Sequence, residues 1–96
     1  MGHVSEKTDS YAFGIILLEL VMAVGPRACV GMMMHDAEFF SALHQHTDAR
    51  AGEWPAKAVS GMAAAAARCT EFRPRNRAKV KDVLPKLMAL SRECRV

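Results

Sequence analysis

The apolar positions of this chain recur at helical spacing along most of its length, and no stretch alternates convincingly with the two-residue period of a strand. The longest stretch covers residues 8–23: it has a polar start and is then apolar on almost every side. Such a helix has to be buried all round. Thr8 or Asp9 can accept hydrogen bonds from its first free N–H groups, and Gly25-Pro26 ends it, because glycine readily adopts the left-handed conformation and proline cannot continue the helix. We therefore expect residues 8–23 to form the central helix, after an irregular lead-in over residues 1–7.

Gly14 lies inside this helix, where it costs about 1 kcal/mol relative to alanine, so we expect another backbone to come close there. Residues 25–31 are predicted to form a loop, and the methionines at 32–34 to provide adaptable packing. A second helix is predicted from Asp36, its N-cap, to residue 45 or 46, and residues 47–52 break it. Its inner stripe consists of Phe39, Phe40 and Leu43.

The third predicted helix opens at Trp54-Pro55 and ends near Cys69, because proline is preorganised for a first turn. Alanines at 63–67 favour a helix and permit a close contact with a neighbour.

The Arg73-Pro74 pair then interrupts the pattern, since the residue before a proline is pushed out of the helical region. The last predicted helix starts near Ala78, and Pro85 inside it should remove one backbone hydrogen bond and kink it. Its apolar face is formed by Val80, Val83, Leu84, Leu87 and Leu90. The pattern predicts an all-α fold of about four helices around a central apolar helix.

The composition fits one small helical domain. The chain has 96 residues, of which 51% are hydrophobic and 24% charged, with a net charge of +3; this is enough for one domain and excludes a disordered tail. Cys29, Cys69 and Cys94 are odd in number and widely spaced, which favours reduced thiols and a cytoplasmic location over a disulfide framework. We see no secretory leader, and the apolar run 12–24 is shorter than the roughly 20 residues that a membrane span needs.

Two blocks of sequence resemble one protein family. Residues 2–20, GHVSEKTDSYAFGIILLEL, resemble the segment that opens the large central helix of the protein-kinase C-terminal lobe. Their sequence is most similar to that of plant receptor-like and interleukin-receptor-associated serine/threonine kinases. Residues 69–84, CTEFRPRNRAKVKDVL, resemble the last conserved block of the same lobe. The chain therefore looks like a partial kinase domain over residues 1–96, downstream of the activation segment, although residues 27–51 match loosely.

The resemblance implies a parent domain that phosphorylates serine or threonine in proteins, using ATP and Mg²⁺. Phosphoryl transfer requires a glycine-rich loop, a strand lysine, a His-Arg-Asp catalytic loop and an Asp-Phe-Gly metal ligand. None of these motifs, nor Ala-Pro-Glu, occurs in the 96 residues. We therefore expect no catalytic residue, no nucleotide or metal ligand and no activity in this chain alone. The kinase N-lobe and the upstream C-lobe segments are then its implied partners.

Three residues match structural positions of the family, and a fourth, Glu19, matches a position that can face the substrate. Asp9 resembles the aspartate that accepts hydrogen bonds from the catalytic-loop backbone; the simpler interpretation is a helix cap. Gly14 matches the place where neighbouring segments cross the central helix. Arg77 resembles the arginine that pairs with the glutamate of Ala-Pro-Glu; without that partner it must be exposed, find Glu53, Glu71 or another acid, or destabilise the fragment. Glu19 matches a position that faces the substrate groove in some kinases, and an ordinary surface or hydrogen-bonded role is the alternative.

Other interpretations concern binding rather than catalysis. The basic residues between 73 and 81 lack interleaved aromatics beyond Phe72, which disfavours nucleic-acid binding. His35, His44 and His46 do not form a persuasive zinc set and are expected on a solvated face. A helical interaction module that docks a partner or self-associates through exposed apolar surface is the alternative function. The parent could also be the intracellular part of a membrane receptor, and the coding sequence upstream of Met1 would discriminate a truncated gene from a true fragment.

Overall fold

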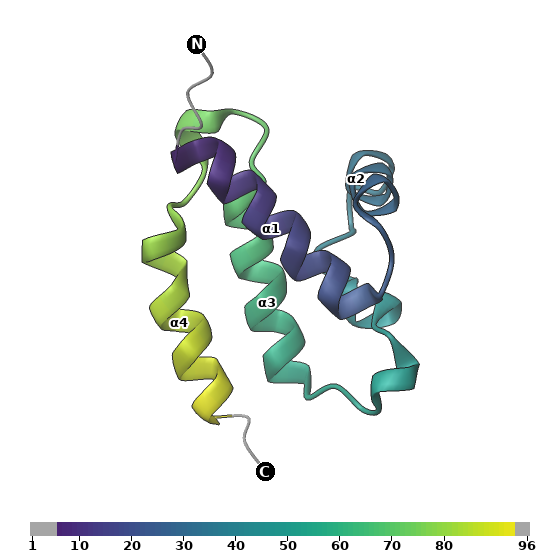
Figure 1. Cartoon of the computed structure of the whole chain (residues 1–96). Helices are drawn as coiled ribbons and strands as arrows, with labels where there is room; N and C mark the ends of the chain where they lie inside the picture. The colour runs from purple at the N-terminus through teal and green to yellow at the C-terminus, as the bar shows by residue number, and fades with distance from the viewer. Residues whose placement is uncertain (1–5, 94–96) are drawn as a thin grey trace.

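The computed structural model describes residues 6–93, which form four α-helices and three short 3₁₀ helices without any strand (Figure 1). The α-helices are α1 (Glu6–Met22), α2 (Pro26–His35), α3 (Ala56–Cys69) and α4 (Val80–Glu93). The 3₁₀ helices are η1 (Leu43–His46), η2 (Ala49–Ala51) and η3 (Pro74–Asn76). The predicted all-α fold is confirmed.

Helix α1 begins two residues before the predicted start, at Glu6, so the predicted lead-in was wrong for residues 6 and 7, and the rest of it lies outside the described residues. Asp9 consequently lies within the first turn and is not the N-cap. The other end also differs from the prediction: Ala23, not Gly25, takes the left-handed conformation, with φ of 56°, and its N–H donates to Glu19 O at 2.8 Å. Gly25 is extended at the N-cap of α2, because Pro26 disfavours a helical residue before it, so the chain has to turn earlier.

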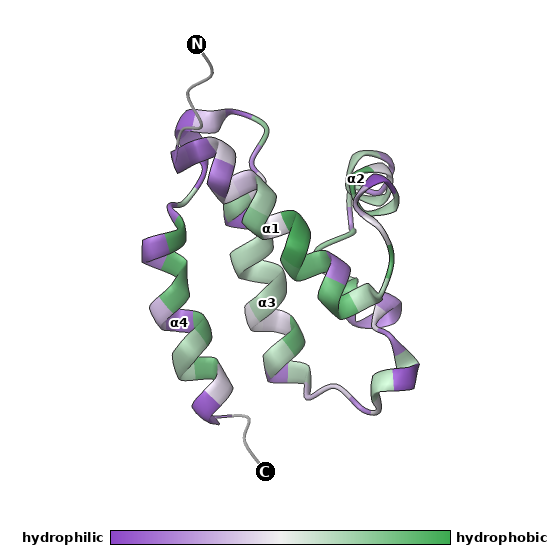
Figure 2. Ribbon diagram, viewed as in Figure 1, coloured by the Kyte–Doolittle hydropathy of each residue, from purple (hydrophilic) through white to green (hydrophobic). Residues whose placement is uncertain are grey.

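Helix α1 is the helix against which α2, α3 and α4 all pack, and its contact with α3 is the most extensive. Leu18 and Val21 are fully buried within the core. Figure 2 shows that the strongly hydrophobic part of α1 follows a hydrophilic first turn. The expected burial on all sides was wrong, because Ile16 is 50% and Leu20 65% exposed on a side that the other described helices leave open. Among the described residues no single helix is long and apolar enough to cross a membrane. Helices α1 and α2 together have the required length and hydropathy, but the chain bends by 97° between them.

The segment from 25 to 46 departs most from the sequence prediction. Residues 26–35 form α2 instead of a loop, because Pro26 occupies the first turn, where its missing N–H is not needed. The helix predicted from Asp36 is absent. Residues 37–42 form turns, partly closed by hydrogen bonds between residues three apart, such as Phe39 N–H to Asp36 O, and only η1 in this segment is helical. Phe39 and Leu43 are nevertheless buried as predicted. The sequence therefore predicted correctly that these two side chains are buried, but wrongly that the segment is an α-helix.

Helices α3 and α4 follow the prediction closely. Pro55 is the N-cap of α3, which ends at Cys69, and Arg73 is extended before the proline of η3. Helix α4 starts two residues later than predicted and contains Pro85. On its predicted apolar face Val83 is buried, whereas Leu84 is 43% exposed.

Candidate functional site at the start of helix α1

Arg77, on the loop that precedes α4, joins the two sequence blocks that resemble kinases. Its Nε donates to Glu71 O at 2.7 Å, and its two terminal nitrogens donate to Lys7 O at 3.2 Å and Phe72 O at 3.4 Å. Lys7 also donates a hydrogen bond in the opposite direction, from its Nζ to Arg77 O at 2.6 Å. Residues separated by 70 positions are thus held together by a reciprocal pair of hydrogen bonds.

The partners of Arg77 differ from those expected. The sequence predicted an exposed arginine, a carboxylate partner such as Glu53 or Glu71, or an unstable fragment. In the structure the side chain is half-buried and uses backbone carbonyls, including that of Glu71, while its guanidinium lies over the Tyr11 ring at 4.7 Å. Carbonyl dipoles and an aromatic face both stabilise a cation, so a carboxylate is not required to offset the partial loss of water.

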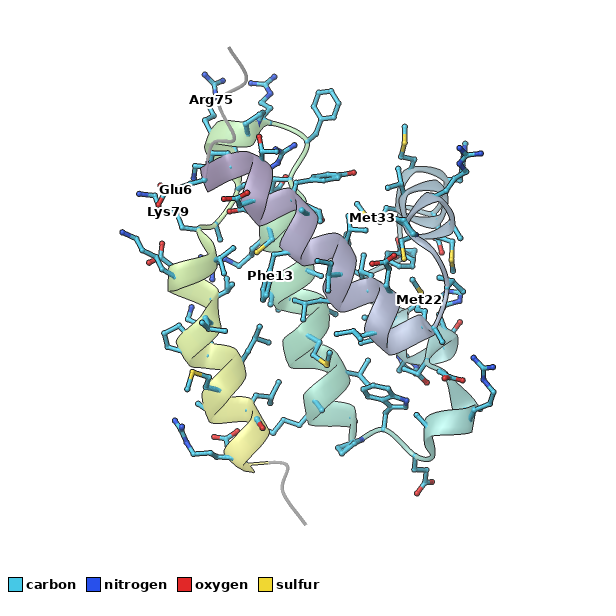
Figure 3. All side chains as sticks on the ribbon, in the orientation of Figure 1. Glu6, Phe13, Met22, Met33, Arg75 and Lys79 are labelled. Carbon is cyan, nitrogen blue, oxygen red and sulfur yellow. The ribbon has the colours of Figure 1, made fainter. Side chains whose placement is uncertain are left out.

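Asp9 is exposed one turn along α1 and borders a crevice of about 180 Å³ between the first turns of α1 and α4. Lys79 and Lys81 line the same crevice, and Lys79 Nζ lies 3.5 Å from a carboxylate oxygen of Glu6 (Figure 3). Within residues 6–93 the Asp9 carboxylate accepts no hydrogen bond and pairs with no cation. The acid is therefore available to groups outside this structure, and the predicted capping role was wrong.

The close approach expected at Gly14 is present. A Cβ built there would lie 2.5 Å from Thr70 Cγ2 and 3.2 Å from both Ala66 O and Cys69 Cβ. Thr70 is held in place, because its hydroxyl donates to Ala66 O at 2.7 Å. The absence of a side chain at Gly14 is what lets α1 lie against the last turn of α3.

Glu19 is half-buried on α1 and lies toward α2. Burial raises the pKa of the Cys29 thiol above its ordinary value, and the negative charge of Glu19 raises it further. Burial also raises the pKa of Cys69, although nearby Arg68 acts in the opposite direction. Cys29 and Cys69 are free thiols, and Cys94 lies outside the described residues. The substrate-facing role of Glu19 stays a prediction.

An open groove of about 530 Å³ adjoins the Arg77 contacts. It runs between α1, α2 and the end of α3, and two of its residues are strongly exposed, Met34 at 77% and Phe72 at 92%. The complete lining is Tyr11, Met33, Met34, Phe40, Ala67, Thr70, Glu71, Phe72 and Arg77. Neither Tyr11 nor Lys7 was predicted from the sequence as a site residue; the signal that could have indicated Tyr11 was its position two residues after Asp9 in the first block.

The histidines behave in two ways. His35 and His44 are exposed as expected, whereas His46 is half-buried and stacks on the Phe39 ring with centroids 5.8 Å apart. The solvated face predicted for His46 was therefore wrong. Among residues 6–93, no three His, Cys, Asp or Glu side chains come together in an arrangement that could hold a metal ion.

Two sets of Arabidopsis thaliana proteins match almost the whole chain. U-box domain-containing protein 51 is 40% identical over 93% of this chain, and U-box domain-containing protein 35 is 38% identical over 95%. PTI1-like tyrosine-protein kinase 3 is 34% identical over 90% of the chain. The chain is similar to plant protein kinases and to plant U-box domain-containing proteins.

The chain spans only part of these relatives: 11% of the length of each of the two U-box proteins and 24% of the kinase. No protein-family model and no solved structure matches it. The similarity to kinases agrees with the resemblance of the two blocks, while the U-box proteins were not expected from the sequence.

Proposed function

We propose that this chain is the helical lower part of a protein-kinase C-terminal lobe, in which it supports phosphoryl transfer without performing it. The observation that carries the proposal is the packing of the two kinase-like blocks against each other. Arg77 and Lys7 exchange hydrogen bonds, and Gly14 admits Thr70 of the second block. A chance likeness of two separate motifs gives no reason for their residues to meet in one site.

The U-box relatives fit the same proposal. More than nine-tenths of this chain matches proteins named for a U-box, and nine-tenths matches a protein named as a kinase. One helical segment is therefore common to both sets. Because the match covers 11% of each of the two U-box proteins, we infer that the shared segment is a kinase-type part that is separate from the U-box in their names.

Asp9 and Arg77 have distinct roles in this proposal. Asp9 offers an unpaired carboxylate near the positive end of the α1 dipole, where it can accept hydrogen bonds from the backbone of a catalytic loop. Arg77 fixes the orientation of that end of α1 through Lys7 and Tyr11. Both are positioning residues, since the ATP and Mg²⁺ of the parent reaction would be held by loops that this sequence does not contain. The protein substrate and its serine or threonine acceptor follow from the resemblance alone, whereas the cytoplasmic location is proposed from the odd number and wide spacing of the cysteines.

The second candidate is a non-catalytic helical interaction module, and one observation favours it. Ile16 and Leu20 lie four residues apart on the open side of α1 and are exposed by half or more. In the kinase proposal the upstream C-lobe segments cover this side, whereas in the alternative a separate protein or a second copy does.

A chimera tests the kinase proposal. In PTI1-like tyrosine-protein kinase 3, the segment that matches this chain is replaced by residues 6–93, and phosphate transfer from Mg-ATP to the kinase's own substrate is measured. We expect an active chimera whose kcat falls about a hundredfold in Asp9→Asn, because the catalytic loop loses its anchor. Asp82→Asn is the matched control, since Asp82 is also an exposed acid in the first turn of a helix. The isolated 96-residue chain should show neither saturable Mg-ATP binding nor turnover.

Two results would contradict this assignment. One is a chimera that melts cooperatively and binds ATP but transfers no phosphate. The other is an active chimera in which Asp9→Asn and Asp82→Asn have equal kcat. A dimer or a captured partner that disappears in Leu20→Glu, combined with either result, would support the interaction module instead.

A further inference from the structure

A cleft of about 380 Å³ lies between α3 and α4, apart from the contacts of Arg77. The two helices run antiparallel (Figure 1). An ion pair of 2.7 Å between Lys57 Nζ and Glu93 Oε2 joins the start of α3 to the end of α4. At the opposite end, Ala78 N–H donates to Arg68 O at 2.8 Å. The cleft therefore has two well-defined ends.

The lining between these ends is apolar. Its main residues are Ala65, Val83, Leu87 and Leu90. Gly61 leaves room for the Leu90 side chain, with which a Cβ at this position would collide, and Ala64 contributes only a small side chain to the lining. A volume of this size with an apolar lining is typical of small-molecule sites rather than of packing defects.

The charges at the two ends differ. Glu93 is neutralised by Lys57, whereas Arg68 and Lys86 line the cleft without a hydrogen bond or ion pair from their side chains to any residue in the range 6–93. Long helical side chains lean toward the N-terminus of their own helix. Because α3 and α4 are antiparallel, this tendency would bring the side chains of Arg68, at the end of α3, and Lys86, in the middle of α4, toward each other. The cations thus lie at the Arg68 end and in the middle of the cleft, whereas the Lys57–Glu93 end is an ion pair.

We propose that the α3–α4 cleft binds a single-headed anionic amphiphile, an aliphatic carboxylate whose chain lies along the apolar lining and whose head meets Arg68 and Lys86. The distance along α3 from Gly61 to Arg68 is about 10 Å, which suits a medium-length alkyl chain. An acidic helix fits less well, because its charges would be spread along its length and fewer than two of its turns would fit in the cleft.

The test is a titration of the ¹⁵N-labelled 96-residue chain with sodium octanoate, followed by NMR. We expect saturable shifts confined to residues of α3 and α4 that line the cleft. Octanol, which has the same chain and no charge, should bind about fivefold more weakly, and octyltrimethylammonium more weakly still. Lys86→Glu should weaken octanoate binding by about fivefold or more, while Arg92→Glu, the matched charge reversal on the same helix, should leave it unchanged.

Ala64→Phe provides a second variant that acts by volume instead of charge. Ala64 is exposed, so the phenyl ring can fill the cleft without disturbing the core, and it should abolish the octanoate shifts. Absence of saturable shifts in the native chain, shifts centred on another surface, or equal binding of octanoate and octyltrimethylammonium would each overturn the proposal.

Discussion

Replacing Gly14 by alanine tests the contact by which α1 packs on α3. The new Cβ would meet Thr70 Cγ2 at 2.5 Å and two further atoms at 3.2 Å. Thr70 cannot rotate away without breaking the 2.7 Å hydrogen bond from its buried hydroxyl to Ala66 O. Overpacking of this kind costs about 1–3 kcal/mol, and the better helix propensity of alanine returns up to about 1 kcal/mol. We therefore expect the free energy of unfolding to fall by about 1–2 kcal/mol.

The assay is urea unfolding followed by Trp54 fluorescence and far-ultraviolet circular dichroism. For a chain of this size, the expected loss lowers the urea midpoint by roughly 1 M. Gly31→Ala is the matched control, because Gly31 lies inside α2 and a Cβ added there would have no atom within 4 Å. That substitution should stabilise the chain by up to about 1 kcal/mol.

A double-mutant cycle identifies the contact. Thr70→Ser removes Cγ2 and keeps the hydroxyl, so Gly14→Ala should be better tolerated in that background by about 1 kcal/mol. The explanation fails if Gly14→Ala is as stable as the native chain, or if its effect is the same with threonine and with serine at position 70.

Three further predictions concern stability. Arg77→Lys should cost about 2 kcal/mol, because a lysine cannot reach three carbonyls and the Tyr11 ring together, whereas Arg75→Lys on the exposed surface should be neutral in the same urea assay. Burial raises the pKa values of Cys29 and Cys69 above 9.0, so the folded state holds these protons more tightly than the unfolded state. This contribution to the free energy of unfolding is present below pH 9 and should decline as the pH rises through the folded-state pKa values. A variant with alanine at both cysteines should lose stability less steeply with rising pH. An equally steep loss in that variant would refute the assignment to the two thiols. Pro85→Ala should raise the free energy of unfolding by about 2 kcal/mol by restoring a helix hydrogen bond, and an unchanged midpoint would show that the helix already accommodates the proline.

The sequence by itself determined the helical residues of α3 and α4, where a 3.6-residue apolar period follows a proline signal, although it did not predict that Pro26 opens α2. Trp54-Pro55 and Arg73-Pro74 marked the start of α3 and the break before α4 correctly, because a proline restricts its own backbone and that of its predecessor locally. The sequence also identified Gly14 as a point of close approach and the two blocks that meet there. The proline signals depend on residues close together in the chain, whereas the segment that approaches Gly14, the end of α3 with Thr70, is distant in sequence.

The tertiary structure alone decided features that depend on distant residues. The segment around Asp36 buries Phe39 and Leu43 as turns and a 3₁₀ helix, because a short apolar stripe can be satisfied by more than one local conformation. Arg77 found carbonyls on Lys7 and Glu71 instead of a carboxylate, since a local pattern does not reveal which backbone groups folding leaves nearby. The open side of α1 at Ile16 and Leu20 likewise reflects how many helices pack around it, which hydropathy along one helix does not encode.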